Sequence, residues 1–534
     1  MANRIEILDT TLRDGAQSEG VVFSREDKIK VIRALDELGV DFIEAGNPAS
    51  NPKDSELFAF ALERLRLKNA QIVAFGSTCR VGARAEQDSG LRALCASGAR
   101  VVSLFGKSSL FHAERVLRTT GEENLRLIRD SIAFLRAQGR TVFFDAEHFF
   151  DGYMYDAAYA MRTLRAALEA GAKRLVLCDT NGGTLPDDIR RVTAEANRLA
   201  PGMVGIHCHN DAGLATACTL SGIQGGAVHA QGTINGYGER CGNANLCQVA
   251  PNLVFKMNLP CLAEGSISRL AACARLVSEI ANLSMDEHSP YVGRSAFAHK
   301  GGMHIDGMLK DSRSFEHIDP GLVGNRRRYL VSEMAGRGAL MTRLSVIAPE
   351  LTKDSAQTGR IMDMLKELES QGYSFEGADG SLKLRVLGAL GRRGSFFEVM
   401  DFHVVSRKPE SRINAQAYVK VRVGDMQEIT ADEGDGPVNA LDLAVRKALS
   451  RFYPCLNKMR LNDFKVRVVD RRGTASSVRV QIESTDGEHV WSTVGVSGNV
   501  IEASFVALTD SIEYMLLSEK QGWPAPGAPR GEAP

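Results

Sequence analysis

The sequence lacks long apolar runs and paired cysteines. No run of about 18 apolar residues occurs, so we expect no contact with membranes. The first residues, MANRIEILDTTLRDG, contain no apolar region of the kind found in secretion signals. Ten cysteines occur without any CxxC pair, which is typical of reduced thiols rather than of a disulfide framework. We therefore expect a cytoplasmic protein.

The sequence also lacks an excess of charge of either sign. The 65 Lys and Arg residues balance the 65 Asp and Glu residues, so the formal net charge is zero. This balance argues against a general nucleic-acid binder, and we expect no nucleic-acid partner. Apolar residues at 44% and charged residues at 24% are ordinary for globular proteins and exclude overall disorder. At roughly 100–200 residues per domain, 534 residues predict about three domains.

Short apolar runs alternate with helical segments over the first 262 residues. The segment between Ser24 and Gly39, for example, has helical periodicity, with a serine cap and a glycine after its end. Eight strand–helix units of this total length predict a closed (β/α)8 TIM barrel, an α/β fold. The alternative, an open doubly wound sheet, is weakened because no Gly-rich phosphate loop follows the first strand. The expected strands are 5–9, 42–45, 72–75, 101–105, 142–145, 175–178, 204–207 and 230–234.

The remaining chain divides further. Residues 263–392 are mostly helical, with a Gly/His-rich loop expected at 297–310. In residues 393–520, Asp401-Phe402-x-Val404 recurs 62 positions later as Asp463-Phe464-x-Val466. This repeat predicts a duplicated α+β domain, either with a ligand in a central crevice or as a dimerisation scaffold. The last residues, 521–534, are rich in Pro, Gly and Ala and are expected to form a disordered tail.

Polar and ionisable residues cluster where the predicted barrel strands end. His207 and His209 are alternate residues at a strand end, so both imidazoles can reach one metal ion. Asp14 is the best-placed carboxylate to join them, because the neighbouring Arg13 favours its ionised form. Asn243 could supply a further oxygen or could be a turn residue. Alternatively, the two histidines are hydrogen-bonded surface residues.

Three more strand-end residues are candidates for contact with a substrate. The Arg13 guanidinium suits a substrate carboxylate or enolate oxygen, although a structural salt bridge to Asp14 or Glu44 is the alternative. Thr180 could donate its hydroxyl to the same carboxylate or belong to a simple turn. Glu147 could position the substrate or a water, or be a solvated loop acid.

Outside the barrel, the segment 297–310 carries a candidate base. His304, with Asp306 two residues on, resembles a base and its orienting carboxylate. The alternative is a Gly-rich linker with solvent-exposed histidines. The basic run 326–328 could meet phosphates or be a solvated face.

The runs DTTLRDGAQ, HCHND, GERCGNAN and AHKGGMHIDG resemble the isopropylmalate, homocitrate and citramalate synthase family. These metal-dependent TIM-barrel enzymes condense acetyl-CoA with a 2-oxo acid, and the resemblance covers essentially the whole chain. The segments SNPKDSELF, AEHFFDGY, DTNGGTLP and FEHIDPGLVGNRRR look most like the family members that make citramalate from pyruvate for isoleucine biosynthesis. The alternative within the family is a 2-isopropylmalate synthase, which uses 2-oxoisovalerate. Outside it, we consider a lyase of the hydroxymethylglutaryl-CoA type and a non-catalytic amino-acid sensor.

The resemblance implies roles for the candidate residues. A divalent cation (Mg²⁺, Mn²⁺ or Zn²⁺) would be held by Asp14, His207 and His209, with Asn243 contributing. Arg13 and Thr180 would bind the oxo acid, and Glu147 would line the site. His304 would reach the barrel from the partner subunit of a homodimer and act there in deprotonating acetyl-CoA. Residues 393–520 would bind an end-product amino acid, which a citramalate pathway suggests is isoleucine. The chain departs from the family at Phe315, where a tyrosine is common.

Overall fold

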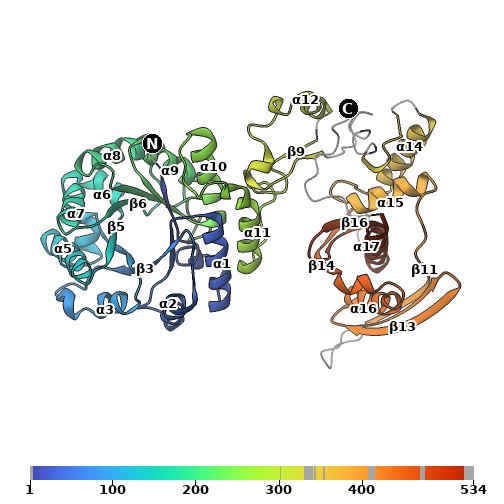
Figure 1. The fold of residues 1–534 in the computed structure, drawn as a ribbon, viewed down its shortest axis with the longest axis horizontal. Coiled ribbons are helices and arrows are strands. Elements are labelled where there is room, and N and C mark those ends of the chain that lie inside the picture. The colour runs from blue at the N-terminus through green and yellow to red at the C-terminus, as the bar shows by residue number, and fades with distance from the viewer. Residues whose placement is uncertain are drawn as a thin grey trace. The chain divides into compact units, whose positions relative to one another are not determined.

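A computed structural model describes residues 4–300, 302–329, 341, 344, 346–352, 355–406, 415–469 and 476–521 (Figure 1). They fall into two compact units, residues 1–297 with 316–327 and residues 298–315 with 328–534. Each unit is described by itself below. No described helix has both the length and the apolar character needed to cross a bilayer. All but the first residue of the expected tail lie outside the described residues.

The first unit is a closed barrel of eight parallel strands, which confirms the predicted fold and makes the open-sheet alternative wrong. The barrel closes because β1 pairs in parallel with both β2 and β8. The predicted strand ends are correct to within two residues. The eighth strand ends at Gly232 because Thr233 leaves the ladder and its N–H donates to Ala244 O at 3.0 Å. The strands are β1 (Glu6–Asp9), β2 (Phe42–Gly46), β3 (Gln71–Ser77), β4 (Val101–Lys107), β5 (Thr141–Glu147), β6 (Arg174–Asp179), β7 (Val204–Cys208) and β8 (His229–Gly232).

Helices surround the barrel and bury one face of each on the strands. Helix α1 (Arg25–Leu38) begins at a capping box in which Ser24 and Asp27 satisfy each other's backbone N–H groups, and it ends at Gly39 with φ 81°. The other helices are α2 (Pro52–Arg64), α3 (Ser89–Ala96), α4 (Leu110–Arg115), α5 (Gly121–Ala137), α6 (Phe149–Tyr155), α7 (Ala157–Glu169), α8 (Pro186–Leu199), α9 (Ala215–Gln224), α10 (Leu246–Lys256) and α11 (Leu270–Ala281).

The barrel interior is apolar at one level and polar at the next. A separate cluster fills the inside of the barrel and consists of Leu8, Val73, Val101 and Phe143, with Phe42 packed against it. Side chains on a strand return to the same face every second residue. The next inward positions toward the carboxyl ends of β2, β4 and β5 hold the buried polar side chains of Glu44, Ser103 and Asp145. This alternation gives the barrel a polar layer at the end where active sites of such barrels lie.

The second unit contains the predicted repeat. Each half has a three-stranded antiparallel sheet followed by a helix, and the first strand of each half carries a β-bulge. The bulges lie at Val399/Asp401 and Leu461/Asp463, at equivalent positions of the two halves. The first half is β11 (Glu398–Ser406), β12 (Ala415–Val423), β13 (Met426–Gly434) and α16 (Pro437–Ser450), and the second is β14 (Arg460–Val468), β15 (Val478–Thr485), β16 (Val490–Ser497) and α17 (Val500–Gln521).

The same unit contains helices α12 (Gly302–Lys310), α14 (Ala356–Ser370) and α15 (Asp379–Ala389), and β9 (Ala298–His299) paired with β10 (Arg328–Tyr329). The expectation of a loop over residues 297–310 is wrong, since most of this segment is α12. Ile305 and Met308, three residues apart, are buried on one face of this helix. Their packing outweighs the low helix propensity of the neighbouring glycines.

Candidate active site

Three of the predicted metal ligands lie together at the carboxyl end of the barrel. Asp14 follows β1, His207 is in β7, and His209 lies just beyond the end of β7. One ligand atom from each of the three lies within 4.8 Å of the others, and all three side chains are buried. His209 keeps its inward direction because its N–H donates to Asp179 O at 3.2 Å and it forms a β-bridge with Asn243.

The protonation states of this group suit a divalent cation. Burial lowers the pKa of His207, and burial together with the neighbouring His207 lowers the pKa of His209 to about 4, so both rings are neutral at pH 7. Burial opposes ionisation of Asp14, but its pKa still lies below the ordinary value, chiefly because the charged Arg13 guanidinium is close by. One carboxylate and two imidazole lone pairs are the ligands that such a cation needs.

Asn243 lies at the same place with an acceptor to spare. Its side-chain N–H donates to Tyr237 O at 3.1 Å, whereas its buried Oδ1 has no hydrogen-bond partner. A buried polar atom without a partner costs about 1–3 kcal/mol unless a ligand satisfies it. The residues present therefore fit a divalent cation held by Asp14, His207 and His209, with an oxygen of Asn243 available.

Arg13 is held in place by two carboxylates. Its Nε donates to Glu44 Oε2 at 2.6 Å, and its Nη1 lies 3.2 Å from Asp14 Oδ2. Its guanidinium carbon lies 3.8 Å from the centre of the Phe75 ring. Burial would lower the pKa of Arg13, but the charges of Glu44 and Asp14 raise it. The salt bridges that the sequence left as an alternative are present, yet a guanidinium has five N–H groups, and these pairs engage only Nε and Nη1.

Glu147 and Thr180 lie on the neighbouring strand ends. Glu147, the last residue of β5, forms an ion pair with Lys107, the last residue of β4. The Thr180 Oγ1 accepts a hydrogen bond from the His148 N–H at 2.8 Å, which leaves its own proton to donate elsewhere. Glu147 is thus a paired rim residue rather than a freely solvated acid.

His304 belongs to the second unit, so the structure describes only its local surroundings. It is exposed on α12, and its ring stacks on Phe315 with centroids 4.1 Å apart and planes at 20°. A Cβ on Gly307 would lie 2.7 Å from the Phe315 ring, so this glycine makes room for the stack. Phe315, the position that departs from the family, therefore contacts the candidate base.

Glu44, Lys107 and Gln231 also lie in or beside the site, although the residue pattern predicted no functional role for them. All three are polar residues within or at the end of apolar strands, and that signal could have identified them. The basic run 326–328 is partly committed elsewhere, because Arg327 donates to both oxygens of the buried Glu316.

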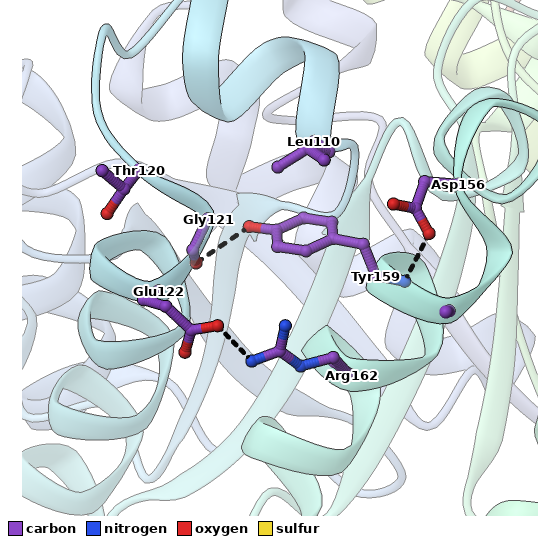
Figure 2. A pocket seen from close by; sticks show the side chains of 8 residues that line it. Leu110, Thr120, Gly121, Glu122, Asp156, Tyr159 and Arg162 are labelled. Atoms are coloured by element: carbon purple, nitrogen blue, oxygen red, sulfur yellow. Dashed lines mark hydrogen bonds and ion pairs between the residues drawn. The ribbon is translucent and has the colours of Figure 1, made fainter.

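A shallow hollow lies elsewhere on the rim of the barrel, between the first turns of α5 and α7 (Figure 2). Its volume is about 300 Å³. Its polar groups bind one another: the Tyr159 hydroxyl donates to the backbone oxygen of Gly121 at 3.2 Å, and Glu122 forms an ion pair with Arg162. The ionisable groups of the site are not among its lining residues.

Three family models match this chain in succession. Residues 4–277 match the HMGL-like family, residues 291–373 match the homocitrate synthase post-HMGL domain-like family, and residues 376–516 match the LeuA allosteric (dimerisation) domain. The first match covers the barrel with all its candidate ligands, and the last covers the duplicated unit.

Curated relatives match over nearly the full length. An (R)-citramalate synthase of Synechocystis sp. is 46% identical, over 96% of each chain, and one of Aquifex aeolicus is 45% identical, over 98% of this chain and 99% of that one. A probable 2-isopropylmalate synthase of Methanopyrus kandleri is 31% identical, over 96% of this chain and 99% of that one. The chain therefore belongs to the HMGL-like family of barrel enzymes and, within it, to the group of condensing acyltransferases that contains the (R)-citramalate synthases.

Proposed function

We propose that this chain is an (R)-citramalate synthase, which joins acetyl-CoA to pyruvate and hydrolyses the thioester to give citramalate and CoA. The main support for this proposal is the sequence identity of 45–46% with (R)-citramalate synthases over nearly the full chain. The buried group of Asp14, His207 and His209 beside Arg13 supports the same chemistry. Five relatives that are 43–46% identical are (R)-citramalate synthases, whereas the probable 2-isopropylmalate synthase is 31% identical, and this contrast favours citramalate.

The residues of the barrel would bind and orient pyruvate. A divalent cation held by Asp14, His207 and His209 would act as a Lewis acid that polarises the ketone. Arg13, kept in place by Glu44, would donate to a pyruvate oxygen and stabilise the alkoxide that develops when the new carbon–carbon bond forms. Thr180 would donate its hydroxyl to the pyruvate carboxylate, and Glu147 would line the site beside Lys107.

We assign proton abstraction from the acetyl-CoA methyl group to His304. The imidazole would take the proton, and the resulting enolate would attack the ketone carbon of pyruvate. Stacking on Phe315 would orient the ring. Water would then hydrolyse the thioester, which makes the overall reaction irreversible. If His304→Ala left kcat within about threefold of the wild type, this assignment would be wrong.

The second unit would carry regulation. Its match to the LeuA allosteric (dimerisation) domain supports a homodimer, and we propose isoleucine, the end product of a citramalate pathway, as its effector. The ten cysteines, none of them in a disulfide, support a location in the reducing cytoplasm.

A 2-oxo acid panel tests the substrate. Release of CoA from acetyl-CoA is measured with pyruvate, 2-oxobutyrate, 2-oxoisovalerate and 2-oxoglutarate. We expect kcat/KM for pyruvate to exceed that for 2-oxoisovalerate by at least about tenfold, because extra methyl groups in a closed pocket change binding by about 1–3 kcal/mol each. A preference for 2-oxoisovalerate would instead support a 2-isopropylmalate synthase. Metal binding without CoA release from any oxo acid would support a sensor.

A further inference from the structure

A chain of four buried polar side chains crosses the inside of the barrel. His207 Nδ1 lies 2.9 Å from Gln231 Oε1, and Gln231 Nε2 donates to Asp145 Oδ1 at 3.1 Å. The other oxygen of Asp145 accepts from Ser103 Oγ at 3.0 Å. The four residues come from β7, β8, β5 and β4, and each is at most 5% exposed.

The hydrogen bonds among these four side chains run in one direction. A glutamine amide has a donor end and an acceptor end. Turning it round would place the Gln231 carbonyl oxygen against the Asp145 carboxylate, which repels it. The carbonyl oxygen therefore faces His207 Nδ1, so this nitrogen must carry the proton.

The ionised carboxylate of Asp145 fixes this direction, because both of its oxygens can only accept and both have a donor, Gln231 Nε2 and Ser103 Oγ. A protonated Asp145 keeps the same direction when Oδ2 holds the proton and donates to the Ser103 hydroxyl, since Oδ1 then still accepts from Gln231. Only a proton on Oδ1 would allow the amide to turn.

The other nitrogen of His207 faces the candidate ligands. Nε2 lies 3.4 Å from His209 Nε2 and 3.5 Å from Asp14 Oδ2. In the competing tautomer Nε2 would carry the proton and could donate to Asp14, which would block the lone pair. The hydrogen bonds from Gln231 to Asp145 and from Ser103 to Asp145 disfavour that tautomer. Inward positions of such barrels usually hold branched apolar residues, so buried Gln and Asp are a costly choice for packing alone.

We propose that Gln231 and Asp145 are positioning residues that hold His207 as the Nδ1–H tautomer and so keep Nε2 available for the cation. The inference rests on the proposed metal site and extends it to residues that touch neither the cation nor the substrate. Loss of such an outer partner typically weakens metal binding by about 10–100-fold.

The test measures Mn²⁺ binding to the chelator-treated full-length protein by the electron paramagnetic resonance of free Mn²⁺. Gln231→Met keeps the length of the side chain but removes the acceptor, and we expect its Kd for Mn²⁺ to rise by about 10–100-fold. Gln231→Glu supplies an acceptor for Nδ1–H again, and one proton shared between its carboxyl group and Asp145 removes the repulsion between them, so we expect it to recover most of the affinity. Steady-state kinetics of the same variants should show the loss relieved by excess Mn²⁺.

The matched control is Ser131→Ala. Ser131 is also buried, and its hydroxyl accepts from the Cys79 N–H at 2.9 Å and donates to Leu127 O at 2.6 Å, away from the ligands. It should lower Tm without changing the Kd for Mn²⁺. An equal loss of affinity in Ser131→Ala and Gln231→Met would overturn the proposal, because the effect would then be general destabilisation.

An affinity of Gln231→Met within about threefold of the wild type would also overturn it. If Gln231→Met does not fold, Asp145→Asn is measured in its place. The Gln231 amide can turn either way in that variant, so its affinity for Mn²⁺ should fall, though by less than the fall expected for Gln231→Met. Unchanged affinity there contradicts the proposal. His207→Ala tests the metal site separately from the role of Gln231 and Asp145. If this variant still bound Mn²⁺, the metal site itself would be refuted.

Discussion

At the scale of single residues, the structural ion pairs of Arg13 and its proposed contact with the substrate, which the sequence presented as alternatives, are compatible. Its ion pairs with Glu44 and Asp14 are structural, and the same pairs hold the guanidinium beside the candidate metal ligands. A flat guanidinium can keep both pairs and still donate to a substrate, whereas a lysine ammonium cannot reproduce that geometry.

We therefore predict that Arg13→Lys lowers kcat/KM for pyruvate by about 100-fold or more, a loss of about 3 kcal/mol of transition-state stabilisation. The stoichiometry of bound metal should stay at the wild-type value, because the three ligands are retained. The measurements are steady-state CoA release and metal analysis. Arg174→Lys, which changes a partly buried ion pair with Glu6 at 2.7 Å, is the control and should leave kcat unchanged. A similar loss in both variants would contradict the role of Arg13.

Glu6 predicts a pH dependence of stability. Burial opposes its ionisation, but hydrogen bonds from His229 and Arg174 outweigh burial and lower the pKa of Glu6 to about 2 from 4.5. A lowered folded-state pKa stabilises the protein above the unfolded-state value, and this stabilisation is lost as pH falls from about 4.5 toward 2.

Glu6→Gln should therefore lower the free energy of unfolding at pH 7, and its difference from the wild type should shrink between pH 4.5 and 2. Urea unfolding of the full chain at several pH values measures it. Glu86→Gln removes an exposed ion pair between Glu86 and Arg84, whose charged atoms are 3.6 Å apart. It should have little effect on the free energy of unfolding at any pH. A difference for Glu6→Gln that did not change with pH would refute the assignment.

At the scale of elements, the turn after β6 supports the strand that carries the histidines. Gly182 has φ 64°, and a Cβ there would lie 2.5 Å from Asp211 Oδ2 and 2.8 Å from Asp211 N. The adjacent Gly183 has open space around its Cβ position. Two neighbouring glycines in one turn thus differ in what they tolerate.

We predict that Gly182→Ala costs about 2–4 kcal/mol of stability, from the left-handed backbone and the close contact with Asp211. It should also weaken Mn²⁺ binding, since the clash pushes on the segment next to His209. Gly183→Ala should change stability by less than about 0.5 kcal/mol. Urea unfolding and Mn²⁺ titration of both variants check this, and equal effects of the two substitutions would contradict it.

Sequence periodicity predicted the elements of the barrel better than those outside it. Every barrel strand and the cap at Ser24 were predicted correctly, because both patterns are local. Helix α12 was missed, since glycines in 297–310 suggested a loop while the burial of Ile305 and Met308 stabilises a helix. That burial arises only in the folded protein, so the local residue pattern does not reveal it.

At the scale of the whole molecule, the two halves of the repeat differ in one respect. Phe402 of β11 is covered by Phe505 of α17, with ring centroids 4.5 Å apart. Its equivalent in β14 is Phe464, and Phe464, Val466 and Val468 lie on one face of that strand, 37%, 47% and 60% exposed. An apolar strand face that is open in the isolated chain is a candidate contact with a second copy.

We predict that the protein is a homodimer and that Val466→Glu shifts the measured mass toward the 58.0 kDa of one chain. A buried, unpaired carboxylate at the contact would be costly. Light scattering coupled to size-exclusion chromatography measures the mass. Val81→Glu, which changes a valine of the barrel that is 44% exposed, is the control and should stay dimeric. A dimer that persists in Val466→Glu would exclude this face.

The sequence by itself determined the closed barrel, the internal repeat and the candidate ligands Asp14, His207 and His209. It could do so because strand period, repeat offset and position at a strand end are all local properties. Only the tertiary structure decided which side chains hold these residues: Glu44 against Arg13, and Gln231 with Asp145 behind His207. These partners come from strands far apart in the sequence, and the curvature and register of the closed barrel bring them within hydrogen-bonding distance.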